Sequence, residues 1–201
     1  MTTSHTAAHG HYTSTGLDNR KVAFWTFIGS ECLLFGTLIA TYLSYEGRSV
    51  SGPTTRQILN IPLTSVSTFD LLMSSLAMVL ALAAVQRGNR VYARVWLATT
   101  ALLGVVFLAF QAYEFTHFVE KGLTLSTNLF GSTFFTLTGF HGGHVFVGVI
   151  WLLTLLVRSL QGKLGPEKAI NVEIAGLYWH FVDVVWIVIF TVVYLIQTTP
   201  P

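Results

Sequence analysis

Five long apolar stretches constrain this chain more than any other feature of its sequence. Each reaches the ~20 residues that a helix, rising about 1.5 Å per residue, needs to cross the hydrocarbon core of a bilayer. Only 10% of the residues are charged and 52% are hydrophobic, which excludes an ordinary soluble domain. The sequence therefore predicts an all-α integral membrane bundle of five transmembrane helices, at about residues 22–45, 64–86, 92–114, 130–157 and 173–197.

The domain organisation follows from the same pattern. Residues 1–21 are polar and lack the short apolar core and cleavage site of a secretory signal, so they are predicted to form a flexible tail before an uncleaved first helix. Residues 22–201 are predicted to form a single five-helix transmembrane domain. Gly-Pro pairs at Gly52-Pro53 and Gly165-Pro166 indicate breaks between helices.

Basic residues predict the orientation. The loops on the N-terminal side carry eight Lys and Arg residues and the opposite loops carry three, so the positive-inside rule places the N-terminus in the cytoplasm and the C-terminus outside. The net charge of +2 is small and the basic residues are spread over separate loops, which argues against a nucleic-acid partner. With one cysteine, Cys32, no disulfide framework can form within the chain.

Ionisable residues inside the predicted spans are the candidate functional residues, because polar groups in hydrocarbon are costly and usually face protein or water. Glu31 in the first helix lies at a depth similar to that of His180 and Asp183 in the fifth, so these side chains can meet. His141 and His144 are three residues apart in the fourth helix, as His180 and Asp183 are in the fifth, and each pair projects from one helix face.

Two interpretations of these residues remain open from spacing alone. One is an iron or zinc site, with Glu114 as a further ligand, in a stand-alone metal-dependent membrane enzyme. The other is a buried polar network that sets helix register. The two Glu-x-x-His pairs that bundle-borne di-metal sites use do not both occur in this sequence, and this favours the network. Near the helix ends, Glu114 and Glu173 are expected to be interfacial.

Small residues and the polar tail suggest two further roles. Gly139 and Gly143 have the small-xxx-small spacing that lets helix backbones approach closely, so the fourth helix is predicted to pack centrally. The tail histidines titrate near pH ~6.5 when unperturbed and lie on the predicted cytoplasmic side, where they would form a proton antenna. The alternative is a tail of no functional consequence. These tail residues are His5, His9 and His11.

Four motifs together resemble one known family. They are Phe27-Ile28-Gly29-Ser30-Glu31, Gln111-Ala112-Tyr113-Glu114-Phe115, Thr138-Gly139-Phe140-His141-Gly142-Gly143-His144 and Trp179-His180-Phe181-Val182-Asp183-Val184-Val185-Trp186. In this order and spacing, over about residues 25–194, the chain resembles subunit III of the haem–copper terminal oxidases, the cytochrome c or quinol oxidase subunit 3 family, in its five-helix bacterial form.

The resemblance implies a non-redox subunit of a proton-pumping oxidase that reduces dioxygen to water in aerobic respiration. It implies no catalytic, metal or cofactor site in this chain, with haem and copper in partner subunits. The partners would be catalytic subunit I, subunit II, subunit IV in some assemblies, and membrane lipids, in a bacterial plasma membrane. Glu31 matches the family's intramembrane carboxylate, and His141, His144, His180 and Asp183 match its buried polar positions, which favours the network over the metal site.

One departure from the family concerns lipid. Longer members have seven helices and hold phospholipid in a cleft between the first two helices and the other five. This chain lacks counterparts of those two helices, so equivalent helices would have to come from the catalytic subunit. Both cytochrome c and quinol oxidases have five-helix members, and the motifs do not distinguish the electron donor.

Overall fold

The computed structural model describes residues 18–49 and 59–196, so the tail histidines His5, His9 and His11 lie outside the described residues. Within those ranges the regular structure is helical, and five helices are long and apolar enough to cross a membrane. This confirms the prediction of an all-α five-helix membrane protein. The elements are α1 (Asn19–Tyr45), α3 (Ile61–Gln86), α4 (Arg90–Glu120), α5 (Leu129–Leu160), a 3-10 turn (Pro166–Lys168), α6 (Ala169–Phe190) and a π-helical turn (Thr191–Leu195).

Local sequence signals set both ends of the first four long helices. The side chain preceding each helix accepts a hydrogen bond from a backbone N–H in its first turn, which satisfies a donor that the helix leaves open. These caps are Asp18, Asn60, Asn89 and Asn128. Each helix is followed by a glycine at a φ between 70° and 82°, a left-handed conformation that glycine adopts without steric cost. These glycines are Gly47, Gly88, Gly122 and Gly162.

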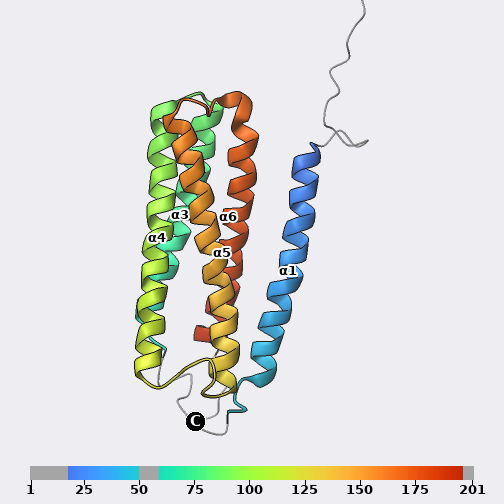
Figure 1. The fold of residues 1–201 in the computed structure, drawn as a ribbon, viewed down its shortest axis with the longest axis vertical. Coiled ribbons are helices and arrows are strands. Elements are labelled where there is room, and N and C mark those ends of the chain that lie inside the picture. Colours follow the sequence, from blue (N-terminus) through green and yellow to red (C-terminus); the bar gives the residue numbers. More distant parts are fainter. Residues whose placement is uncertain (1–17, 50–58, 197–201) are drawn as a thin grey trace, which may run out of the picture.

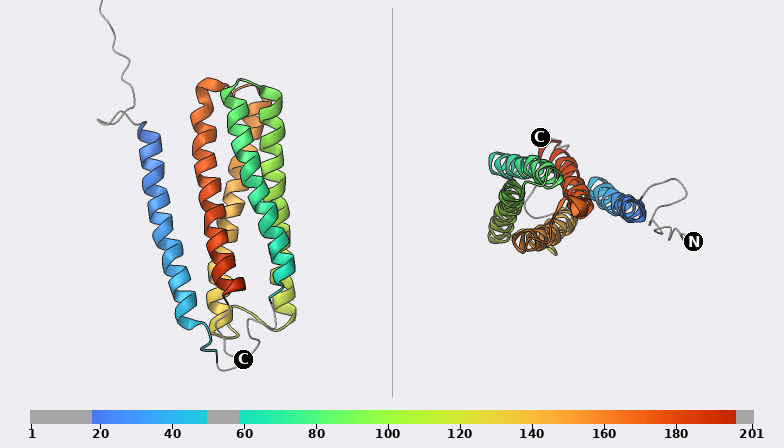
Figure 2. Two further views of the ribbon diagram at one scale, coloured as in Figure 1. Left: turned by 180° about the vertical axis from the view of Figure 1, so that it is seen from behind. Right: turned by 90° about the horizontal axis from the view of Figure 1, so that it is seen from above.

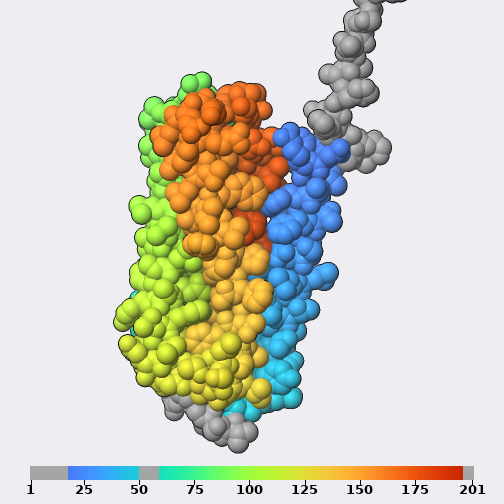
Figure 3. Space-filling model, viewed as in Figure 1, coloured from blue at the N-terminus to red at the C-terminus, as the bar shows by residue number. Residues whose placement is uncertain are grey.

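The helices form a four-helix bundle with one helix leaning against its side. Figure 1 shows α3, α4, α5 and α6 side by side, and the view from above places α1 outside that group, next to α6 (Figure 2). The space-filling view shows α1 as a separate ridge alongside α5 (Figure 3). Only Ile28, Phe35 and Tyr42 of α1 are buried, and their seven-residue spacing makes one narrow seam. The attachment of α1 therefore depends on few contacts.

One tryptophan of α6 contacts each of the other three bundle helices. The indole of Trp179 on α6 is 1% exposed and fills the space left by two glycines. A Cβ atom at Gly104 of α4 would lie 2.6 Å from its Cη2 atom, and one at Gly148 of α5 would lie 2.8 Å from its Cζ3 atom. Its Nε1–H donates to the Ser74 hydroxyl of α3 at 2.8 Å. The core is therefore organised around a large side chain of α6 that fits into small residues of its neighbours.

Candidate functional site

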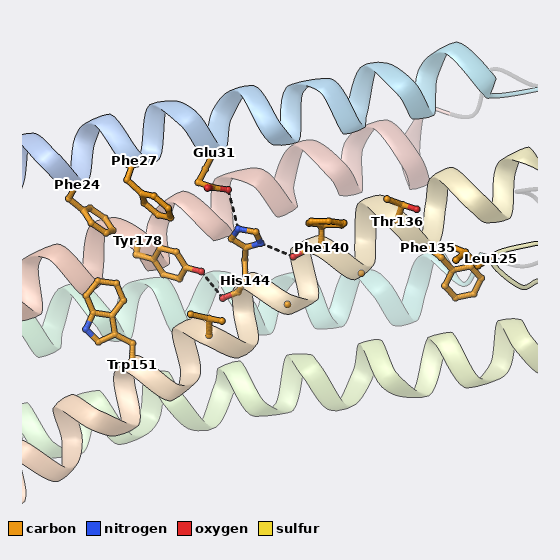
Figure 4. Close-up of a pocket in the computed structure, with 13 residues that line it drawn as sticks. Phe24, Phe27, Glu31, Leu125, Phe135, Thr136, Phe140, His144, Trp151 and Tyr178 are labelled. Atoms are coloured by element: carbon orange, nitrogen blue, oxygen red, sulfur yellow. Dashed lines mark hydrogen bonds and ion pairs between the residues drawn. The ribbon is translucent and has the colours of Figure 1, made fainter.

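A polar contact joins α1 to α5 near the middle of both helices. The Oε2 atom of Glu31 lies 3.1 Å from Nε2 of His144, and both side chains are largely buried, at 15% and 19% exposed. The hydroxyl of Tyr178 on α6 donates to the His144 carbonyl at 3.0 Å, which brings a third helix to the same point (Figure 4). Sequence reasoning singled out both Glu31 and His144, and the structure brings them together.

The hydrogen bonds of His144 show how many protons this contact needs. Nδ1 lies 2.8 Å from the Phe140 carbonyl oxygen, which can only accept, so Nδ1 carries a hydrogen. In a neutral ring Nε2 would then be an acceptor, and an ionised Glu31 is also only an acceptor. The 3.1 Å contact is a hydrogen bond only when one more proton sits on the ring or on the carboxyl group. A hydrogen bond between α1 and α5 at this point therefore includes that additional proton.

A large apolar groove opens beside this contact, between α1 and α5. Its volume is about 960 Å³, and Figure 4 shows the aromatic side chains that line it around Glu31 and His144. Gly139 and Gly143 lie on its α5 side, and a Cβ atom at either position would meet nothing within 4 Å. The close backbone approach expected at these two glycines is therefore absent within the described chain, because aromatic side chains separate α1 from α5. The aromatic lining residues are Phe24, Phe27, Phe135, Phe140, Trp151 and Tyr178.

His141 faces the bundle core instead. Its side chain is fully buried, and its Nε2–H donates to the Val182 carbonyl of α6 at 3.2 Å. The ring packs against Trp186 and Phe107, with centroids 4.7 and 5.7 Å away. His141 therefore joins α5 to α6, although it is only three residues from His144.

His180 and Asp183 face α3. Nδ1 of His180 and the Ser75 hydroxyl are 2.5 Å apart. Asp183 is 3% exposed, and neither of its carboxylate oxygens has a hydrogen-bond partner in the described part of the chain. The Ser75 hydroxyl lies beside this carboxyl group, but its hydrogen-bond contact is with His180. Together these three residues line the interface between α3 and α6.

The five polar residues singled out in the sequence thus occupy three different helix interfaces. Glu31 meets His144 between α1 and α5, and it does not meet His180 or Asp183 as its depth had suggested. The reason is rotational, because α1 lies on the α5 side of α6 while His180 and Asp183 point toward α3. Depth can be counted along a sequence, but the angular position of one helix around another depends on packing.

Glu114 corrects the sequence-based expectation of an interfacial residue. It is 6% exposed and accepts hydrogen bonds from the Thr64 hydroxyl at 2.8 Å and from the Tyr194 hydroxyl at 3.1 Å. The expectation was wrong because α4 continues to Glu120 rather than ending at residue 114. Tyr194 reaches the carboxyl group from the π-helical turn that follows α6. The helix cap at Lys121 and Gly122 was the sequence signal for this longer helix.

An ion pair connects the beginning of α1 to α6. The Nζ atom of Lys21 lies 2.6 Å from Oε1 of Glu173 on α6, and each side chain is about one-third exposed. Sequence reasoning placed Glu173 at the interface but gave it no partner. This pair and the Glu31–His144 contact are the polar side-chain contacts of α1 with α6 and α5 within the described residues.

No group of three or more His, Cys, Asp or Glu side chains that could hold a metal ion is found within residues 18–49 and 59–196. The histidines at positions 141, 144 and 180 each contact a protein group on a neighbouring helix. The fold and these contacts define a multi-pass helical membrane protein whose polar side chains within the spans contact neighbouring helices.

Comparison with known proteins identifies the family. The model of the family "Cytochrome c oxidase subunit III" matches residues 2–198. Similar proteins include cytochrome c oxidase subunit 3 of Alkalihalophilus pseudofirmus, 42% identical over 88% of this chain and 86% of that protein. The probable quinol oxidase subunit 3 of Staphylococcus saprophyticus is 41% identical over 88% of both chains, and quinol oxidase subunit 3 of Bacillus subtilis is 40% identical over 87% of this chain and 85% of that protein. The chain belongs to the cytochrome c oxidase subunit III family.

This assignment confirms the resemblance drawn from the four motifs and a role as subunit III of a haem–copper oxidase. The alternative of a stand-alone metal-dependent enzyme is not supported. Relatives named as cytochrome c oxidase and as quinol oxidase occur at nearly equal identity, so similarity does not separate these two kinds of oxidase for this chain.

Proposed function

We propose that this chain is a non-redox subunit that stabilises the catalytic subunit of a proton-pumping haem–copper oxidase and supports its proton uptake. Haem and copper are carried by partner subunits I and II, and the complex lies in a bacterial plasma membrane with the N-terminus of this chain in the cytoplasm. The observation that carries the proposal is the set of contacts made by the three histidines of the spanning helices. Each one binds a group on a different neighbouring helix, so these side chains act in helix–helix contacts.

The Glu31–His144 contact supports a link to protons. A hydrogen bond in this largely buried place between α1 and α5 requires one proton more than the one on Nδ1 of His144. A chain with such a contact can change its fit to a neighbouring subunit as protons are taken up.

The test is to purify the native oxidase from a host that produces a tagged form of this chain. The expected result is stoichiometric co-purification with the haem-containing subunit and dioxygen reduction that persists, with a shorter working life, when this chain is removed. An oxidase preparation that never contains the chain would contradict the proposal. Immediate and complete loss of dioxygen reduction on its removal would indicate a catalytic role instead.

A further inference from the structure

The groove beside the Glu31–His144 contact has the composition of a ligand site. It runs along most of α1 and α5, from Phe24 in the second turn of α1 to Leu125 in the loop before α5. Its volume of about 960 Å³ suits a small molecule, and such sites are mostly apolar with a few polar groups. A ligand that fills this groove must therefore be elongated and largely apolar.

Glu31 offers such a ligand a hydrogen-bond acceptor. The carboxyl group lines the groove, and its contact with His144 is made by Oε2. The other oxygen, Oε1, remains an acceptor whether the additional proton of the contact lies on Oε2 or on the imidazole. The ligand can therefore form a hydrogen bond with Glu31 if it carries a donor.

The neighbouring donors at this depth are already used within the protein. Nδ1–H of His144 donates to the Phe140 carbonyl at 2.8 Å, and the Tyr178 hydroxyl donates to the His144 carbonyl at 3.0 Å. The ligand must therefore supply the hydrogen itself. A ketone, ester or ether oxygen can only accept, whereas a hydroxyl group can donate.

The depth of Glu31 in the membrane limits the ligand further. Glu31 is twelve residues after the start of α1 at Asn19, which is about 18 Å along the helix axis and near the middle of a hydrocarbon core about 30 Å thick. A phospholipid has only acyl chains at this depth, and acyl chains have no donor. None of the described lining residues is a lysine or arginine that would bind a phosphate group.

Two phenylalanines flank the carboxyl group. Phe27 precedes Glu31 by one turn on α1, and Phe140 precedes His144 by one turn on α5. The two helices are antiparallel, since Phe24 packs against Trp151 while Glu31 meets His144, so the two rings lie on opposite sides of the contact (Figure 4). They are 41% and 49% exposed, which leaves both free to pack against another flat ring.

We propose that the groove binds an isoprenoid hydroquinone of the membrane. One ring hydroxyl donates to Oε1 of Glu31, the ring lies between Phe27 and Phe140, and the isoprenoid chain fills the remaining apolar length of the groove. This class of molecule combines a flat ring, hydroxyl donors and a long apolar chain. The inference goes beyond the proposed function and does not depend on it, because it concerns binding by this chain alone.

Photolabelling of native membranes that contain the full-length chain tests the site. The probe is an azido hydroquinone with a decyl chain, used without dioxygen so that it stays reduced. The expected result is label on groove residues of α1 and α5, and loss of most of that label in an excess of decylubiquinol. Even labelling over the lipid-facing surfaces of all the helices would overturn the proposal. Displacement by phosphatidylglycerol as effective as that by decylubiquinol would identify a lipid site and would also overturn it.

A comparison of competitors tests the hydroxyl donor. The dimethyl ether of decylubiquinol has the same ring and chain but no hydroxyl hydrogen, so it should compete with the probe about tenfold less well than decylubiquinol. Equal competition by the two would contradict the hydrogen bond to Glu31. This comparison uses the wild-type chain and is therefore decisive whether or not a variant folds.

Two glycine substitutions test the location. A Cβ atom at Gly143 or at Gly29 would meet nothing within 4 Å, but only Gly143 lines the groove. Gly143→Leu places a bulky side chain in the groove and should lower labelling about tenfold, while Gly29→Leu is the matched control and should leave it unchanged. Equal labelling of the two variants would show that the probe does not lie in the groove.

Discussion

The indole ring of Trp179 occupies the space in which any side chain at Gly104 would have to lie. A Cβ atom there would be 2.6 Å from the ring and 2.8 Å from Cγ2 of Val149. Both neighbours belong to the buried core and have no room to move away. The packing therefore requires a glycine at position 104, because any larger residue would overlap these neighbours.

We predict opposite effects for two glycine substitutions. Gly104→Ala should destabilise the protein by about 1–3 kcal/mol, the usual cost of overpacking a dense core. Gly139→Ala places its Cβ in open space and should be neutral or stabilising by about 0.5–1 kcal/mol, because alanine favours the helix. Thermal unfolding in detergent measures both. Equal destabilisation by the two would show that Gly139 also has a close neighbour.

The buried carboxyl group of Glu114 leads to a second prediction. Tyr194→Phe removes one of its two hydroxyl donors and should lower the free energy of unfolding by about 1–3 kcal/mol. Tyr113→Phe is the control, because Tyr113 is 62% exposed and its loss of a hydroxyl should change stability by less than about 0.5 kcal/mol. Denaturant unfolding of both variants provides the comparison, and no difference between them would contradict the geometry.

Ser75 provides a third prediction at the interface between α3 and α6. Ser75→Ala removes the hydroxyl that contacts His180 and should cost about 1–3 kcal/mol of stability, because the imidazole loses its partner in a partly buried place inside the spanning segment. Ser65→Ala on the same helix removes a hydroxyl that bonds only its own helix at Ile61 and should have little effect. If the two variants unfold alike, Ser75 does not support His180.

The Glu31–His144 contact leads to a fourth prediction, on the attachment of α1. In Glu31→Gln the side-chain amide can donate to Nε2 of His144, so amide hydrogen exchange in α1 should stay close to that of the wild type.

Glu31→Ala removes the contact and should make amide hydrogen exchange in α1 faster. We expect it to weaken retention of the chain on the oxidase or to shorten the working life of the complex, while dioxygen reduction continues. Equal exchange in α1 of the wild type and of Glu31→Ala would argue against a role of the contact in attaching α1, and an inactive but fully assembled Glu31→Ala oxidase would argue for a catalytic role.

The sequence by itself determined the helices and the family. Apolar stretches of sufficient length must form helices in a membrane, because every backbone polar group has to be satisfied within the segment. The capping Asp and Asn residues and the glycines after each helix set the ends locally. The prediction failed where an apolar stretch stopped before its helix did, and this is why Glu114 was placed at the interface although it lies two turns inside α4.

Only the tertiary structure decided which helices meet. Residue spacing gave Glu31, His180 and Asp183 a common depth, but rotation about the helix axes sends the first toward His144 and the other two toward Ser75. The same limit applied to the glycines, since small-xxx-small spacing at Gly139 and Gly143 faces a groove while Gly104 receives Trp179. Side-chain packing between helices sets these rotations, and it depends on residues that lie far apart in the sequence.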